Sequence, residues 1–450
     1  MSVTRWRRAL VVGLGVSGVA ACRLLRSLGV AVRAYDQASE EALASRLAQL
    51  PPDVEVFTGK VSKGLLTEID VVVTSPGVAP SSSIIAQARS LKLPVLPEVE
   101  LAYQFAGKTP IVGVTGSNGK STVTDLVGQI LRTAGLSVGV GGNLGTAASA
   151  LVLEGGWEVM VWELSSFQLE LTSTLRPKVA VFSNFSPDHL DRHASVEAYL
   201  QAKAKIFAWQ TGQDLAVLNA DDPIVLRLSL VSQRRHFSLR LQQADAYRKE
   251  DELVLDGKPL LPREQLPLLG DHNVANALAA ALACQGVGVP PETIALGLRH
   301  AKPLPHRHQL VAEAGGVRFV DDSKATNIGA VVSGLAGYPP KSVHLILGGL
   351  GKGQDFSPLL PVVRETVVRA YLIGQAAPAL QEILAGRVPV ELCGTLAEAV
   401  RRAKYFAQAG EVVLLAPACA SFDQFRDYAH RGEEFIRLVQ EGGREPHAQT

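Results

Sequence analysis

The sequence has few cysteines, no excess of either charge and no long apolar run, and each absence narrows what the protein can be. Its four cysteines form no CxxC pair, which argues against a disulfide framework or a zinc site and favours reduced thiols in a cytoplasmic protein. With 44 basic and 43 acidic side chains, no general attraction to nucleic acid or to an anionic membrane is expected. No run of about 18 uncharged apolar residues predicts a membrane span. Arginines precede apolar residues 9–12, as in a signal peptide, but glycines interrupt that stretch, which better predicts a strand and turn.

Strand and helix patterns are present instead, and they alternate along the chain. Apolar residues make up 47% and charged residues 19%, as in globular proteins with buried cores, and 450 residues suggest about three domains. We expect domains at residues 1–106, 107–300 and 301–450. The alternation argues for α/β domains with parallel sheets and helices on both faces. Strands are expected at residues 9–12, 31–35, 71–74, 111–115, 138–140, 159–163, 179–183, 215–219, 317–320, 343–347, 370–373 and 412–416, helices at 18–28, 40–50, 121–133 and 273–285, and short strands within 235–267.

A glycine-rich segment, GVTGSNGKS at residues 113–121, follows an expected strand and opens an expected helix. Backbone N–H groups at a helix N-terminus carry partial positive charge, and small residues let phosphate oxygens approach them. Lys120 adds a full charge for the β- and γ-phosphates, and Ser121 supplies an oxygen for Mg²⁺. The usual Walker spacing requires a glycine where Val114 stands. The segment therefore predicts an ATP-binding loop of an unusual kind, and the alternative is an ordinary strand–helix turn.

Two polar side chains at expected strand ends are candidate metal ligands. Glu163 ends the strand at 159–163, where a carboxylate would hold Mg²⁺ beside the nucleotide, unless it faces solvent. His189 follows the strand at 179–183, and ligands of α/β sheets gather at the carboxyl ends of strands. The alternative is that Asp188 and His189 form a simple turn.

Lys203 stands on an apolar helical stripe. It lies three residues after Leu200 and four before Phe207, on the face that Tyr199 and Ile206 share. A buried lysine is costly unless it is paired or chemically altered. The alternative, which composition alone favours, is that the stem packs while the amine reaches solvent.

A second glycine-rich segment, GLGVSG at residues 13–18, also joins an expected strand to a helix, and Asp36 ends the next strand. This matches the dinucleotide fingerprint and, taken alone, would suggest NAD. The geometry itself indicates only a diphosphate or nucleotide near a helix N-terminus. A second phosphate loop in the next domain favours a substrate that carries a nucleotide diphosphate.

Together these segments resemble the Mur ligase family over nearly the whole chain. The segments that carry the resemblance are, in order, GLGVSG, TSPGV, GVTGSNGKST, GGNLG, ELSSFQLE, SPDHLDRH, QAKAKIF, GDHNVANALAA, HRHQ, DDSKATN, GGLGKGQDF and ACASFDQF. The resemblance implies an N-terminal Rossmann-like domain for a UDP-sugar substrate, a central P-loop ATPase-like domain and a C-terminal Rossmann-like domain for an amino acid. It implies an ATP-dependent amide ligase of peptidoglycan precursor synthesis, which adds D-glutamate to UDP-N-acetylmuramoyl-L-alanine through an acyl phosphate.

The resemblance also assigns roles to matching residues. ATP would be held by Gly116, Ser117, Asn118, Gly119, Lys120, Ser121, Thr122, Asn276, Arg307 and Asp322. The UDP-sugar would be held by Gly15, Val16, Ser17, Asp36, Gly77, Asn143, Ser165, Gln168 and His189, and D-glutamate by Lys324, Thr326, Lys352, Ser421 and Tyr428. Two Mg²⁺ ions would be held by Ser121, Glu163, His189 and Lys203, with Lys203 carbamylated by CO₂. Lys120, Glu163, His189 and Lys203 would be the catalytic residues of a cytoplasmic monomer that acts on small molecules.

Some positions depart from the family pattern or leave alternatives open. Gln37 and Ala38 replace the Thr or Ser that often follows the acid of the second strand, so contacts to the uracil end stay unassigned. Tyr428 stands where a relative has Phe, which implies a role for its ring or backbone. His189 is also a candidate general base, a role that competes with metal binding. Three rival readings are another amide ligase of the family, a nicotinamide oxidoreductase built on GLGVSG, and a nucleotide-binding protein without catalysis.

Overall fold

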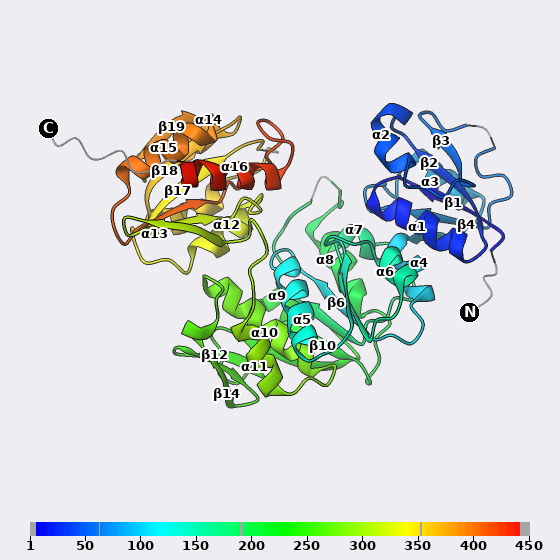
Figure 1. Cartoon of the computed structure of the whole chain (residues 1–450), viewed down its shortest axis with the longest axis horizontal. Coiled ribbons are helices and arrows are strands. Elements are labelled where there is room, and N and C mark those ends of the chain that lie inside the picture. The colour runs from blue at the N-terminus through cyan, green and yellow to red at the C-terminus, as the bar shows by residue number, and fades with distance from the viewer. Residues whose placement is uncertain (1–5, 63, 190–191, 352, 442–450) are drawn as a thin grey trace. The chain divides into compact units, whose positions relative to one another are not determined.

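The structure, a computed structural model, describes residues 6–62, 64–189, 192–351 and 353–441. Strands and helices alternate along the chain, and the strands form three sheets (Figure 1). The chain divides into two compact units, one of residues 1–262 and 276–298 and the other of residues 263–275 and 299–450. The first unit contains two of the sheets and the second contains the third.

The first sheet is parallel throughout, as expected from its alternating elements. Its strands, from one edge to the other, are β3 (Glu55–Thr58), β2 (Ala31–Asp36), β1 (Arg8–Val12), β4 (Val71–Thr74) and β5 (Val95–Pro97). Its helices are α1 (Val16–Ser27), α2 (Glu40–Leu47), α3 (Ser83–Ser90) and α4 (Glu98–Phe105). Ala9 and Val11 of β1 pack with α1, whereas Leu10 and Val12 pack with α3, so helices cover both faces.

The second sheet is the largest and carries the glycine-rich loop. Its strands, in spatial order, are β14 (Lys258–Pro262), β13 (Glu252–Leu255), β12 (Ala246–Lys249), β11 (Gln233–Ser238), β10 (Leu215–Asn219), β9 (Val179–Phe182), β6 (Ile111–Thr115), β8 (Val159–Glu163) and β7 (Val138–Gly142). Only β12–β13 and β13–β14 pair antiparallel, and these strands form the short-strand excursion that the sequence predicts. The helical elements are α5 (Lys120–Thr133), α6 (Ala148–Glu154), α7 (Ser166–Leu169), α8 (Val196–Ala204), η1 (Lys205–Phe207), α9 (Pro223–Leu226), η2 (Arg263–Gln265), α10 (Asp271–Gln285) and α11 (Pro291–Arg299).

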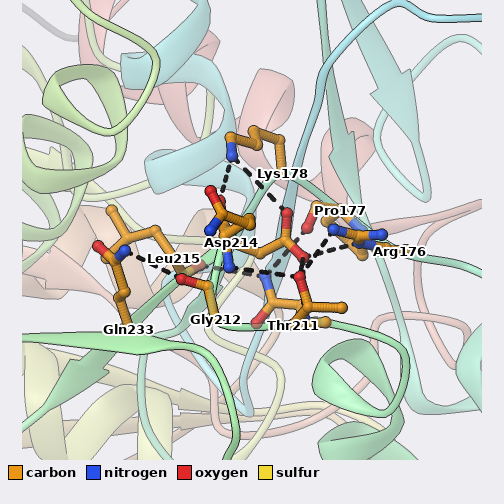
Figure 2. Close-up of polar contacts among 10 residues, drawn as sticks. Arg176, Pro177, Lys178, Thr211, Gly212, Asp214, Leu215 and Gln233 are labelled. Atoms are coloured by element: carbon orange, nitrogen blue, oxygen red, sulfur yellow. Dashed lines mark hydrogen bonds and ion pairs between the residues drawn. The ribbon is translucent and has the colours of Figure 1, made fainter.

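Polar side chains bond the amino ends of β9 and β10, at the opposite end of the strands from the glycine-rich loop (Figure 2). Asp214 is buried and accepts from Nε of Arg176 at 2.7 Å and from the backbone N–H of Thr211 at 2.8 Å. Gln210 donates to the carbonyls of Pro177 and Leu215, at 3.0 and 3.1 Å. These bonds satisfy buried polar groups at the start of two paired strands of the central sheet.

The third sheet is parallel except for its edge strand β15. Its strands, in spatial order, are β15 (Gln309–Ala314), β16 (Val317–Asp321), β20 (Val412–Leu415), β17 (Val343–Gly348), β18 (Val367–Ile373) and β19 (Val390–Gly394). The helical elements are α12 (Ile328–Leu335), η3 (Ser357–Leu359), α13 (Leu360–Thr366), α14 (Ala377–Leu384), α15 (Leu396–Phe406) and α16 (Tyr428–Glu441). Separate buried clusters lie on its two faces, one with α12 to α14 and one with α15 and α16.

Candidate active site

The glycine-rich loop connects β6 to α5, as the sequence predicts. Gly119 immediately precedes α5 with φ of +81°, a left-handed conformation that favours glycine, and an ideal Cβ there would lie 2.5 Å from Oδ1 of Asn276. Asn276 of α10 therefore lies against the loop, although it is distant in sequence. The Lys120 ammonium donates to the carbonyls of Gly116 and Ser117, at 2.8 Å each. The loop thus combines a helix N-terminus with a fixed positive charge, an arrangement that binds phosphate.

Glu163 lies beside this loop at the end of β8, which pairs in parallel with β6. Its carboxylate is buried, with 2% of the residue exposed, and accepts from the Ser121 hydroxyl and, at 2.7 Å, from Nδ2 of Asn143. Glu163 is therefore not a solvent-facing acid. A carboxylate and a hydroxyl in contact beside a phosphate loop are oxygen ligands of the kind that Mg²⁺ prefers.

Lys203 of α8 is buried, with 1% of the residue exposed, so its amine does not reach solvent. Its amine donates to the Gly116 carbonyl at 2.7 Å and lies 4.6 Å from the centre of the Tyr199 ring. Burial, followed by repulsion from Lys120, lowers the pKa of Lys203 well below its usual value. The structure thus places an amine of lowered pKa against the backbone of the phosphate loop.

His189 lies near Lys203 through a shared aromatic neighbour. Its ring packs 5.0 Å from the Phe167 ring and 6.1 Å from the Tyr199 ring, measured between centres, and its backbone has a positive φ of 53°. Sequence reasoning missed His193, whose ring centre lies 5.2 Å from that of Tyr199 and whose Nε2 lies 3.0 Å from the Ser166 hydroxyl. Burial lowers the pKa of His193, which favours its neutral form. Residues 190 and 191 of this segment lie outside the described residues.

The candidate UDP-sugar residues of the first sheet lie after two neighbouring strands, with Val16 and Ser17 in the first turn of α1. Gly15, Val16 and Ser17 follow β1, and Gly77 follows the neighbouring β4. The Ser75 hydroxyl joins the segments after these strands by donating to the Gly13 carbonyl at 2.7 Å.

Asp36 holds this first glycine-rich loop from the end of β2. Its carboxylate accepts from the backbone N–H of Leu14 at 2.6 Å and from that of Ala38 at 2.9 Å. Both carboxylate oxygens are thus engaged by the protein's own backbone. This observation gives no particular support to recognition of a nicotinamide dinucleotide ribose.

Further candidate UDP-sugar residues lie close to Glu163. The Asn143 backbone N–H donates to the Glu163 carbonyl at 2.8 Å, in addition to the side-chain bond. Ser165 caps α7, and Oε1 of Gln168 accepts from the Ser165 backbone N–H at 2.9 Å. Buried Nε2 of Gln168 has no partner among the described residues. These side chains therefore flank the candidate metal site.

The candidate D-glutamate residues come from two loops of the third sheet. Lys324 and Thr326 follow β16, Ser421 follows the neighbouring β20, and the Lys324 amine lies 4.0 Å from the centre of the Tyr428 ring. Lys352 lies outside the described residues. Near the same strand end, Asp322 accepts from the backbone N–H of His308 at 3.2 Å, and half-buried Arg307 precedes His308.

A buried arginine that sequence reasoning missed ties these two loops together. Arg431, in α16, is fully buried and donates to the Ser323 carbonyl at 2.8 Å, to the Ser323 hydroxyl at 2.9 Å and to the Cys419 carbonyl at 3.2 Å. Burial lowers its pKa to about 10. Its only sequence signal is an arginine on the buried face of an amphipathic helix, which composition alone attributes to a solvated side chain.

The fold and the site together define a nucleotide-dependent enzyme with three β-sheets, each packed against helices. Three family models match, a Mur ligase MurD-like N-terminal domain at residues 7–96, a Mur ligase middle domain at 114–284 and a Mur ligase glutamate ligase domain at 306–419. A UDP-N-acetylmuramoylalanine--D-glutamate ligase from Acidobacterium capsulatum is 43% identical over 96% of both chains. One from Anaeromyxobacter dehalogenans is 44% identical over 97% of this chain and 98% of its own. The chain belongs to the Mur ligase family.

Solved structures share the fold at lower identity. A pseudomurein peptide ligase type C from Methanothermus fervidus has a TM-score of 0.61 at 18% identity, covering 96% of this chain and 99% of its own. A UDP-N-acetylmuramate-alanine ligase from Thermotoga maritima has a TM-score of 0.61 at 20% identity, with the same coverage. In the part of the chain that the structure describes, no helix is both long and apolar enough to cross a membrane.

Proposed function

We propose that this protein joins D-glutamate to UDP-N-acetylmuramoyl-L-alanine in peptidoglycan precursor synthesis, with ATP converted to ADP and phosphate. The observation that carries the reaction is identity of 40–44% over nearly the whole chain to ligases named for it. The site supports the same chemistry, because a phosphate loop, a buried carboxylate and a buried amine meet at the carboxyl ends of β6, β8 and β9.

The residues present fit the Mg²⁺ that Mur ligases use with ATP. Glu163 and Ser121 offer a carboxylate and a hydroxyl that already touch each other. We assign one ion to this pair and a second ion to His189 and carbamylated Lys203. When bound, the ions offset the negative charge of the phosphates and polarise the transferring phosphoryl group.

Carbamylation of Lys203 is consistent with the environment of its amine. A neutral amine can add to CO₂ through its lone pair and then lose a proton, which yields an anionic carbamate. Burial and the Lys120 charge both favour that neutral amine. The modification also removes the free-energy cost of burying an ammonium group, because the product bears oxygen ligands in place of a desolvated cation.

The reaction then proceeds in two transfers. The L-alanine carboxylate attacks the γ-phosphorus of ATP, and ADP leaves as an acyl phosphate forms. The D-glutamate amine attacks the acyl carbon and gives up a proton, and the tetrahedral intermediate collapses with loss of phosphate. Lys120 and the backbone N–H groups that begin α5 hold the ATP phosphates during the first transfer.

The remaining assignments follow the resemblance. The loops after β1 and β4, together with Asn143, Ser165 and Gln168, hold the UDP-sugar, and the loops after β16 and β20 hold D-glutamate. Asn276, Arg307 and Asp322 serve ATP. The protein works in the cytoplasm as a monomer. Sedimentation of the purified enzyme tests its oligomeric state, and a stable dimer would contradict the monomer.

Phosphate release tests the proposed reaction directly. UDP-N-acetylmuramoyl-L-alanine, ATP, Mg²⁺ and D-glutamate should give sustained release, and omitting any one should abolish it. A panel of amino acids tests specificity, because preference for L-glutamate or a diamino acid would identify another ligase of the family. Specific NAD binding by calorimetry, without UDP-sugar binding, would support an oxidoreductase, and no ADP from any mixture would indicate a non-catalytic protein.

Lys203→Ala tests the carbamate. The variant should lose most activity, and short carboxylates added to the assay should restore part of it by supplying the missing oxygen ligand. Lys205→Ala is the matched control, because the Lys205 amine donates to the Glu170 carbonyl at 2.6 Å and not to the phosphate loop. Full activity in Lys203→Ala would exclude the carbamate.

A further inference from the structure

Asn184 follows β9 directly and reaches the phosphate loop with its side chain. Oδ1 of Asn184 accepts from the backbone N–H of Asn118 at 2.9 Å, and Nδ2 donates to the Asn118 carbonyl at 3.0 Å. The Asn184 carbonyl also accepts from the backbone N–H of Ser117 at 2.9 Å. One asparagine therefore pairs with three backbone groups of two adjacent loop residues, Ser117 and Asn118.

A neighbouring side chain strengthens the same contact. The Ser183 hydroxyl donates to the Asn118 carbonyl at 2.6 Å, so that carbonyl accepts two bonds from the segment after β9. The Ser117 hydroxyl in turn bonds the backbone of Ser186, at 2.8 Å to its carbonyl and 2.9 Å from its N–H. The orientation of the Asn118 carbonyl is thereby fixed.

That orientation decides where the next N–H group points. A peptide unit is planar and trans, so its C=O and N–H point in opposite directions. Because the Asn118 carbonyl is held toward the segment after β9, the Gly119 N–H is directed away from that segment. Gly119 stands at the N-terminus of α5, where N–H groups bind phosphate.

The geometry points to Asn184 as a positioning residue that aims the Gly119 N–H at the ATP phosphates. This inference rests on the proposed use of ATP by the loop. Only a carboxamide offers a donor and an acceptor at the spacing of one residue's backbone groups. Aspartate in its place would set a carboxylate oxygen against the Asn118 carbonyl, whereas alanine would only remove the two bonds.

The test compares Asn184→Ala with Asn184→Asp. Asn184→Ala should raise KM for ATP about tenfold, as expected for losing a net hydrogen bond. Asn184→Asp should raise it further, although aspartate matches asparagine in size, and KM for the other two substrates should change little. A packing role predicts the opposite order, with alanine the worse variant.

Asn219→Asp is the matched control. Asn219 ends the neighbouring β10, and its side chain donates to the Ser183 carbonyl at 2.9 Å and accepts from the Asp221 N–H at 2.9 Å. Both bonds go to residues outside the glycine-rich loop. The substitution introduces the same charge nearby, so KM for ATP should stay near that of the wild type. Direct titration of each variant with ATP, with thermal melting to confirm folding, separates lost binding from lost structure.

Two outcomes would overturn the inference. One is wild-type ATP affinity in folded Asn184→Asp, and the other is an equal loss in Asn219→Asp. Neither result touches the proposed function, which the wild-type enzyme tests separately through phosphate release, the amino-acid panel and NAD binding.

Discussion

Two glycines flank helix α5, and we expect alanine to weaken ATP binding at one of them but not at the other. Gly119 precedes the helix and Gly135 follows it, and both have φ of +81°. An ideal Cβ at Gly119 would lie 2.5 Å from Oδ1 of Asn276, whereas one at Gly135 would meet nothing within 4 Å. Alanine therefore adds the same backbone strain at both positions, and only at Gly119 does it also collide with a side chain.

The expected magnitudes follow from that strain. A left-handed alanine costs about 1–2 kcal/mol, and each kcal/mol lowers Tm by roughly 2–4 °C in a domain of about 200 residues. Gly135→Ala should show this loss of stability alone. In Gly119→Ala the loop can relax to a right-handed conformation, which turns the Gly119 N–H. If ATP binding must restore the strained form, binding weakens by roughly 5–30-fold from strain alone, and the collision with Asn276 adds to this.

Titration with ATP and differential scanning calorimetry measure the two effects. Both variants should melt earlier than the wild type, but only Gly119→Ala should bind ATP more weakly. If Gly119→Ala binds ATP with wild-type affinity, the left-handed loop has no role in phosphate binding. If Gly135→Ala loses as much affinity as Gly119→Ala, the effect comes from the stability of α5 and not from the loop.

Three further substitutions test other parts of the structure. Burial raises the pKa of Glu98 to about 7, so the folded protein is more stable when Glu98 is protonated. That stabilisation is lost as the pH rises through about 7. Glu98→Gln should therefore gain about 3 kcal/mol over the wild type between pH 5 and pH 8.5 in urea unfolding, and equal stability profiles would contradict this. Asp214→Asn should lose about 2 kcal/mol with its bond to Arg176, yet keep every KM, since a changed KM would place that cluster in the site. Arg431→Lys should lower Tm and raise KM for D-glutamate more than KM for ATP, in contrast to a purely structural arginine, which would change neither KM.

The central strands of each sheet were predictable because their burial is set by their own sequence. The runs at β4, β6, β8 and β10 match the expected residues at both ends, since a strand buried on both faces is a continuous apolar run. The unexpected strands β3, β15 and β19 are edge strands whose residues are mostly half-buried or exposed. Their pairing comes from the neighbouring strand, so the apolar pattern is weak. The unexpected β5 is also an edge strand and is only three residues long.

Part of the candidate site was predictable for a similar reason. The burial of Lys203 follows from helical periodicity, and the positions of Ser121 and Glu163 follow from the ends of adjacent strands. Asn184 and Arg431 were not predictable, because each acts through bonds to backbone groups distant in sequence. No periodicity marks such bonds, and an asparagine after a strand or an arginine on a helix is usually a solvated residue.

The Gly116 carbonyl joins the lysine that we assign to ATP to the lysine that we assign to a metal ion. The amines of Lys120 and Lys203 both donate to it, at 2.8 and 2.7 Å, so the two nitrogens are no farther apart than the sum of these distances, about 5.5 Å. Two positive charges at that separation repel by about 3 kcal/mol at an effective dielectric of 20, which adds to the effect of burial in lowering the pKa of Lys203. Because Lys203 is buried and Lys120 is not, Lys203 is the amine that gives up its proton. Replacing Lys120 with a neutral residue should therefore raise the pKa of Lys203 and slow its reaction with CO₂. In the proposed mechanism, Lys120 would thus both hold the ATP phosphates and favour the neutral Lys203 amine from which the carbamate forms.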